Sequence, residues 1–86
     1  MLEMEKGARE VIREFVLGTL APARGVTEVG DHESLIDTGI VDSLGVFQLV
    51  AFLEERFAVG IADEDISADN LGSIDAIERL IARKER

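Results

Sequence analysis

The sequence predicts an all-α fold: a four-helix bundle with three longer helices, one short helix and a long loop between the first and second helices. Apolar residues recur at three- and four-residue spacing in separate segments of the 86-residue chain, as they do on the buried face of an amphipathic helix. No segment shows the strict alternation of apolar and polar residues that marks a half-buried strand. The length is typical of one small domain, so we expect residues 1–86 to form a single domain.

The first helix is expected from Leu2 to Leu20, followed by a long loop over residues 21–42. Pro22 should stop the helix, because a proline ring disfavours helical conformation in the residue before it. The helix has an apolar stripe formed by Ala8, Val11, Ile12, Phe15, Val16 and Leu20. The loop also carries apolar residues that should hold it against the core, namely Leu35, Ile36, Ile40 and Val41.

The second helix should run from Ser43 to about Phe57 and is apolar around more than half of its circumference. A surface helix normally has a narrower apolar stripe, so this helix is either central or partly exposed to partners. A short third helix is expected from Asp63 to about Ala68. The fourth helix should begin at Ser73 as its N-cap and pack through Ile74, Ile77, Leu80 and Ile81.

Negative charge dominates the chain, with 18 acidic against nine basic residues and a net charge of −9. Between Glu28 and Glu78, thirteen carboxylates stand against Arg56 alone, a net charge of −12. Such a surface repels nucleic acid and anionic lipid and favours partners with basic patches, although selection for solubility gives the same composition. We therefore expect neither nucleic acid nor membrane as a partner, and a monomeric chain.

Two further features concern the cellular compartment. No apolar run is long enough to cross a bilayer, and Met1-Leu2-Glu3 does not begin a signal peptide. The chain contains no cysteine, which fits a reducing cytoplasm. We expect a cytoplasmic protein in which any thiol must come from an attached group.

The most informative segment is Gly39-Ile40-Val41-Asp42-Ser43-Leu44, where the long loop enters the second helix. One interpretation is helix capping, because Asp and Ser are both preferred N-caps. However, neither residue has a Glu or Gln three positions later, so no capping box forms. A serine in the first turn of a helix, with no nearby base to activate it, is suited to being modified by another enzyme.

This segment resembles the phosphopantetheine attachment site of the acyl carrier protein family, and the resemblance extends from roughly Val11 to Ile81. Later landmarks also match: Leu53-Glu54-Glu55-Arg56-Phe57, Ile61, Asp63-Glu64-Asp65-Ile66 and Ser73-Ile74. Gly-Ile-Val-Asp-Ser followed by Leu-Gly looks closest to stand-alone carriers of specialised pathways, including those that resemble D-alanyl and aminoacyl carriers. Carboxylates soon after the serine, usual in carriers of fatty-acid synthesis, are replaced by Gly45, Val46, Phe47 and Gln48.

The resemblance implies a non-catalytic carrier with 4'-phosphopantetheine attached to Ser43 and Asp42 as a flanking recognition residue. The arm would be attached by a phosphopantetheinyl transferase from coenzyme A. A ligase would load it with an acyl or aminoacyl group, which downstream transferases would use; the cargo itself stays open. The partners must contact the first turns of the second helix. We expect contacts at Leu44, Val46, Phe47, Glu54 and Glu55, with Val46 or Phe47 at the centre.

Other interpretations account for less of the sequence. Asp42-Ser43-Leu44 is similar to part of a hydrolase motif, but Val41 replaces its glycine and the chain's one histidine, His32, lies on the acidic loop. An EF-hand calcium loop beginning at Asp63 lacks the required Gly and Glu, since Ala68 and Ile74 stand there, so no metal site is expected. The remaining alternative is an acidic helical interaction module whose Ser43 is never modified.

Overall fold

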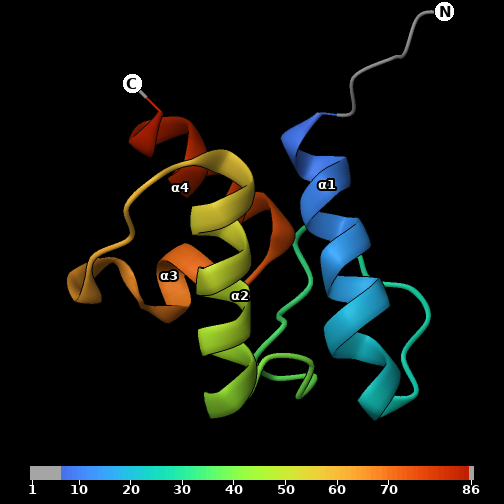
Figure 1. Ribbon diagram of the computed structural model, residues 1–86. Coiled ribbons are helices and arrows are strands. Elements are labelled where there is room, and N and C mark those ends of the chain that lie inside the picture. Colours follow the sequence, from blue (N-terminus) through green and yellow to red (C-terminus); the bar gives the residue numbers. More distant parts are fainter. Residues whose placement is uncertain (1–6, 86) are drawn as a thin grey trace, which may run out of the picture.

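Three helices form a bundle, and a fourth, short helix packs on the last of them. The computed structural model describes residues 7–85. It contains α1 (Ala8–Phe15), α2 (Ser43–Phe57), α3 (Ala68–Leu71) and α4 (Ile74–Lys84). Within these residues all regular structure is helical, which confirms the predicted all-α fold with three longer helices and a short one. The start of α1 and the end of α4 lie at one end of the bundle, and the start of α2 lies at the other (Figure 1).

The first helical segment extends further than expected and changes its geometry on the way. α1 is followed by a π-helical stretch, Val16–Leu20, and then by a 3₁₀ turn, Ala21–Arg24. Pro22 does not stop the helical path, because it lies in the first turn of the 3₁₀ segment, where its missing N–H costs no hydrogen bond. The path ends at Gly25, whose φ of +70° suits a glycine. The expected start at Leu2 lies outside the described residues.

The long connection therefore covers residues 25–42 and is pinned to the core. Leu35, Ile40 and Val41 are buried, as predicted, whereas Ile36 is exposed. The Leu35 N–H donates to the Gly72 carbonyl (2.8 Å), which ties the loop to the segment before α4. Within the loop, the Val41 N–H donates to the Leu35 carbonyl (2.9 Å). The residues that lead into α2 are thus held by a fixed loop.

The boundaries of α2 and the cap of α4 are those predicted, but the third helix is displaced. Instead of one helix from Asp63 to Ala68, a 3₁₀ turn covers Asp63–Asp65 and α3 begins at Ala68. Ser67 separates them because it is extended and its Oγ accepts a hydrogen bond from the Asn70 N–H, which makes it the N-cap of α3. Ser73 caps α4 in the same way, accepting from the Ala76 N–H at 3.1 Å.

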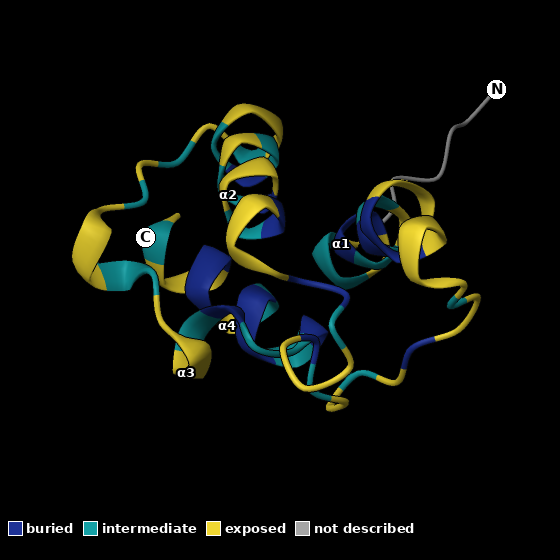
Figure 2. Ribbon diagram, turned by 90° about the horizontal axis from the view of Figure 1, so that it is seen from below, coloured by how far each residue is buried: buried dark blue, intermediate teal, exposed yellow. Residues whose placement is uncertain are grey.

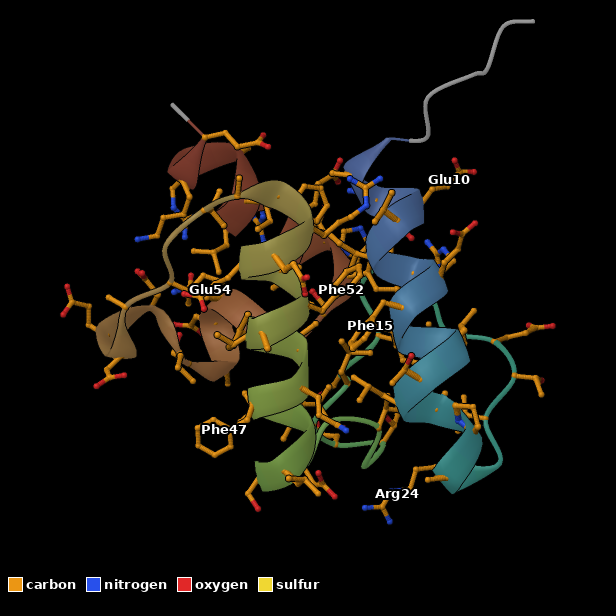
Figure 3. The ribbon with its side chains drawn as sticks, viewed as in Figure 1. Glu10, Phe15, Arg24, Phe47, Phe52 and Glu54 are labelled. Carbon is orange, nitrogen blue, oxygen red and sulfur yellow. The ribbon has the colours of Figure 1, made fainter. Side chains whose placement is uncertain are left out.

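The core lies between α1, α2 and α4, and Figure 2 shows the exposed residues of α2 on the side away from it. Ile12, Leu49, Leu53, Ile74, Ile77 and Leu80 are among its fully or almost fully buried residues. Burial of each such side chain stabilises the fold by about 1.5–3 kcal/mol. Between α1 and α2, the rings of Phe15 and Phe52 stack with centroids 4.1 Å apart (Figure 3).

Arg9 joins three parts of the chain through ion pairs. Its guanidinium lies 2.6 Å from carboxylate oxygens of Asp31 in the long loop and of Asp75 and Glu78 in α4. Neighbouring Arg13 pairs with Asp31 and donates to the Val29 carbonyl. The contacts of Arg9 with Glu78 and Asp75 raise its pKa, and the hydrogen bond to Glu78 contributes most. No helix in the described part of the chain has the length and apolar character needed to cross a membrane.

Candidate functional site

The turn into α2 brings the residues of the Gly39–Leu44 motif together at one end of the bundle. Gly39 has a φ of +80°, a conformation that glycine adopts without a steric penalty. The next two residues, Ile40 and Val41, are buried and fix the direction of the chain. Asp42 and Ser43 then follow on the exposed surface. The local sequence therefore places a polar pair, anchored by two buried residues, at the start of a helix.

Asp42 is the N-cap of α2. The Gly45 N–H donates to its Oδ1 at 2.7 Å, and Arg24 donates from Nη2 to its Oδ2 at 3.1 Å. These interactions lower the pKa of the Asp42 carboxyl, the hydrogen bond from Gly45 first and the charge of Arg24 after it. Asp42 caps the helix even though the residue three positions later is Gly45 and no capping box forms there. The residue expected to take part in recognition therefore also caps the helix.

Ser43 occupies the first position of α2 and is exposed. It follows the cap residue and is not the cap itself, so the fold does not require its hydroxyl for capping. The first N–H groups of a helix have no partner within that helix, and together with the helix dipole they favour an anion nearby. The position therefore combines an accessible hydroxyl with an environment that tolerates negative charge.

The exposed side of α2 continues directly from Ser43. Leu44 and Phe47 are each 67% exposed, an unusual degree for large apolar residues, and Ala51 is exposed one turn further along. We call Leu44, Phe47 and Ala51 the outer stripe of α2. Phe47 projects away from the bundle in Figure 3. Because these positions are three and four residues apart, they lie next to one another on the helix surface.

Two of the residues predicted to contact partners lie elsewhere on the helix. Val46 is half-buried and packs against the core, so Phe47 is the more exposed of the two residues expected at the centre of the interface. Glu54 is also half-buried, and one of its carboxylate oxygens accepts a hydrogen bond from the Ile61 N–H at 2.9 Å. Glu55 is exposed. The helical period explains this arrangement, because Val46 is three residues from buried Leu49.

The sequence analysis missed Arg24. It lies at the end of the 3₁₀ turn, and Figure 3 places it at the end of the bundle where α2 begins. The sequence did contain a signal, since Arg24 is the one arginine or lysine between Arg13 and Arg56. Its partner could not be predicted, because 18 residues of chain separate Arg24 from Asp42.

The other polar residues considered from the sequence are not assembled into a site. His32 is 80% exposed, and its Nδ1 lies 3.8 Å from an Asp75 oxygen at the start of α4. Asp65 is paired with Lys84 and accepts a hydrogen bond from the Ala62 N–H. Both interactions lower the pKa of Asp65, the one with Lys84 more strongly. Across residues 7–85, no group of three or more potential ligands is arranged to hold a metal ion.

In a comparison with known protein families, residues 14–81 match the model described as a phosphopantetheine attachment site. A search of curated protein sequences finds no significant match. The matched region contains the 3₁₀ turn, the long loop and α2 complete, and it ends within α4. It thus includes the capped, exposed serine and covers most of the 86 residues. The chain belongs to the family of carrier proteins that bear a phosphopantetheine attachment site.

Proposed function

We propose that Ser43 is the residue that carries the 4'-phosphopantetheine of this carrier protein. The observation that supports this most directly is the exposed serine immediately after the N-cap of α2, within the region that matches the family. Ser34, Ser67 and Ser73 also lie within that region. Ser67 and Ser73 use their hydroxyls as helix caps, and the Ser34 Oγ accepts a hydrogen bond from the Asp37 N–H.

The surroundings of Ser43 fit a phosphodiester. Its single negative charge would stand at the amino end of a 15-residue helix, where the dipole stabilises an anion by about 0.3–1 kcal/mol. Arg24, paired with the adjacent Asp42, supplies a positive charge close by. The exposure of Ser43 leaves room for a modifying enzyme.

The protein acts as a carrier and is not itself catalytic. When bound, the arm supplies a thiol that holds an acyl or aminoacyl group as a thioester. The bundle keeps the attachment point at a fixed exposed position, and tethering raises the effective concentration of the cargo at each partner's active site. We propose a phosphopantetheinyl transferase, a loading ligase and downstream acyl or aminoacyl transferases as the partners of a monomeric, cytoplasmic chain.

The outer stripe of α2 is the surface that we propose these partners contact. An enzyme that reaches the arm on Ser43 must approach Leu44 and Phe47, whose exposed apolar side chains suit the centre of an interface. Glu55 and Asp42 would then form a charged rim. Val46 and Glu54 remain at the edge of this surface, where their contacts within the fold leave them a smaller part in binding.

The main test is modification of the purified chain by a promiscuous phosphopantetheinyl transferase with coenzyme A and Mg²⁺. Intact mass should show one phosphopantetheine on the wild-type protein and none on Ser43→Ala, because the acceptor hydroxyl is lost. Ser73→Ala is the matched control and should be modified in full. Modification of a correctly folded Ser43→Ala would disprove the assignment, and an unmodified wild-type chain would favour the unmodified interaction module.

A second test concerns the outer stripe. Phe47→Asp should slow loading by the cognate enzyme at least tenfold, equivalent to about 1.4 kcal/mol, because a charge replaces an apolar contact. The exposed position of Phe47 means that the fold should be unaffected. The control is Ala82→Asp, which adds the same charge at an exposed position of α4. If Phe47→Asp loads normally while Glu55→Lys abolishes loading, recognition is electrostatic and the apolar contact is not the centre.

A further inference from the structure

A groove lies beside the proposed attachment site, on the side of α2 that faces the end of the first helical segment. It has a volume of about 270 Å³, and its lining includes Thr19, Ala23, Arg24, Asp42, Leu44 and Gln48. We call it the Arg24 groove. Leu44 and Gln48 are one helical turn apart on α2, and the groove therefore begins at the residue that follows Ser43.

Arg24 stands at the entrance to this groove with part of its hydrogen-bonding capacity unused. Within residues 7–85, the Asp42 carboxylate is its one hydrogen-bond and ion-pair partner, through Nη2. A guanidinium presents several N–H donors in a planar fork that matches phosphate as well as carboxylate. The remaining donors are available to a second anion at the same place.

A phosphodiester on Ser43 would put that second anion next to Asp42. The two residues are consecutive, with Cα atoms about 3.8 Å apart, so both negative charges fall within reach of one flexible arginine side chain. Arg24 is the one arginine or lysine between Arg13 and Arg56 in the sequence. It is half-exposed, so its side chain can adjust without breaking core packing. A shared contact with Arg24 would reduce the repulsion between the two anions.

The lining of the groove also matches the remainder of the arm. Phosphopantetheine carries a pair of geminal methyl groups near the phosphate and two amide groups further along. The groove offers apolar contacts at Ala23 and Leu44 and hydrogen-bonding side chains at Thr19 and Gln48. Leu44 belongs to both the groove and the outer stripe, whereas Phe47 and Ala51 do not line the groove and would stay free for partner enzymes.

We infer that Arg24 is a positioning residue for the prosthetic arm: it pairs with the phosphodiester on Ser43 and directs the unloaded arm into the Arg24 groove. This inference rests on the proposed attachment at Ser43. Its consequence is that the resting arm lies between Leu44 and the first helical segment, away from Phe47 and Ala51, until a partner enzyme withdraws it.

The test compares nitrogen-15-labelled protein before and after modification, with intact mass confirming the attached group. In the wild type, modification should shift the amide signals of Thr19, Ala23 and Gln48, and nuclear Overhauser contacts should join the arm's geminal methyls to those of Ala23 or Leu44. In modified Arg24→Gln these shift changes should fall at least twofold, and the contacts should be lost. Modified Arg56→Gln, which removes the same charge in the last turn of α2, should match the wild type.

The possible failures are distinct. A wild-type protein that carries phosphopantetheine but shows unchanged groove signals would overturn the inference and leave the proposed function intact. Wild-type shifts that persist in Arg24→Gln would overturn the role of Arg24. A wild-type chain that gains no mass would overturn the proposed function together with this inference. Circular dichroism of Arg24→Gln before modification checks that the fold is retained.

Discussion

At the scale of single residues, Asp42 has a structural role as the N-cap of α2 and a proposed role in recognition. Its carboxylate accepts from the Gly45 N–H, and it pairs with Arg24, while the next residue is the proposed attachment point. Gly45 allows the Asp42 carboxylate to come close to its N–H, because a Cβ on residue 45 would lie only 3.2 Å from Asp42 Oδ1. Substitutions at Asp42 therefore affect both helix capping and recognition, and their effects must be separated by measurement.

A pH dependence follows from the lowered pKa of Asp42. The folded state binds a proton at this carboxyl less readily than the unfolded chain does, so its contribution to stability is present above about pH 4 and is lost as the pH falls further. Asp42→Asn should have a lower Tm than the wild type near neutral pH, and this difference should shrink in acid. Thermal unfolding followed by circular dichroism at a series of pH values measures it.

Asp65→Asn provides the comparison for this prediction, because the pKa of Asp65 is lowered by Lys84 and by the Ala62 N–H. Near neutral pH, Asp65→Asn should also have a lower Tm than the wild type, and this difference should shrink in the same acid range. Modification of Ser43 should be unaffected. A difference between wild type and Asp42→Asn that stays constant from neutral to acid pH would mean that the ionised carboxylate of Asp42 does not stabilise the folded state.

At the scale of the helices, similar serines have different roles because of where each helix begins. Ser73 is the N-cap of α4 and Ser67 is the N-cap of α3, whereas Ser43 is one residue inside α2 behind the cap Asp42. The three serines cannot be distinguished by residue type alone. The structure separates them through the hydrogen bonds that their side chains make.

This difference predicts that one serine-to-alanine substitution lowers stability without preventing modification, and that the other prevents modification with little effect on stability. Ser73→Ala should lower the free energy of unfolding by about 1 kcal/mol, because the Ala76 N–H loses its acceptor, while modification by the transferase continues. Ser43→Ala should change stability by less than about 0.5 kcal/mol, as expected for an exposed substitution, and should abolish modification. Urea unfolding and intact mass measure the two effects. Equal destabilisation by both variants would contradict the separate roles.

At the scale of the whole molecule, the excess of negative charge is partly compensated by ion pairs that the fold creates. Arg9 contacts Asp31, Asp75 and Glu78, and Lys84 contacts Asp65. Arg79 also pairs with Asp75 on α4, so two basic residues of α4, Arg79 and Lys84, pair with carboxylates. Arg9 links α1 to the long loop and to α4 through three carboxylates. Its substitution is therefore the best way to test how far ion pairs offset the repulsion between carboxylates.

We expect the Tm of the wild type to rise with added NaCl, because salt screens the remaining repulsion over a Debye length of about 10 Å at 0.1 M. The rise should be larger in Arg9→Gln, where Asp31, Asp75 and Glu78 lose a shared positive charge. Thermal unfolding at low and high salt measures both slopes, and Arg56→Gln controls for the loss of one charge. An equal salt dependence in wild type and Arg9→Gln would show that the carboxylates do not depend on Arg9.

Local patterns in the sequence were sufficient for the class of fold, the exact limits of α2 and the cap of α4. They were also sufficient for the motif around Ser43, because apolar spacing, capping residues and short motifs act within a few neighbouring residues. The same local rules misplaced the end of the first helical segment and the third helix. There, the position of Pro22 in a 3₁₀ turn and the capping by Ser67 decided the outcome.

Tertiary structure alone decided which residues surround the site. The pairing of Arg24 with Asp42, the fixing of the loop by Leu35 and the exposure of Phe47 in place of Val46 all depend on how separate segments pack. The sequence places Ser43 in a motif that resembles a phosphopantetheine attachment site. Contacts between residues far apart in the chain determine what lies within reach of that arm, because no local rule specifies which distant charges and side chains meet at the start of α2.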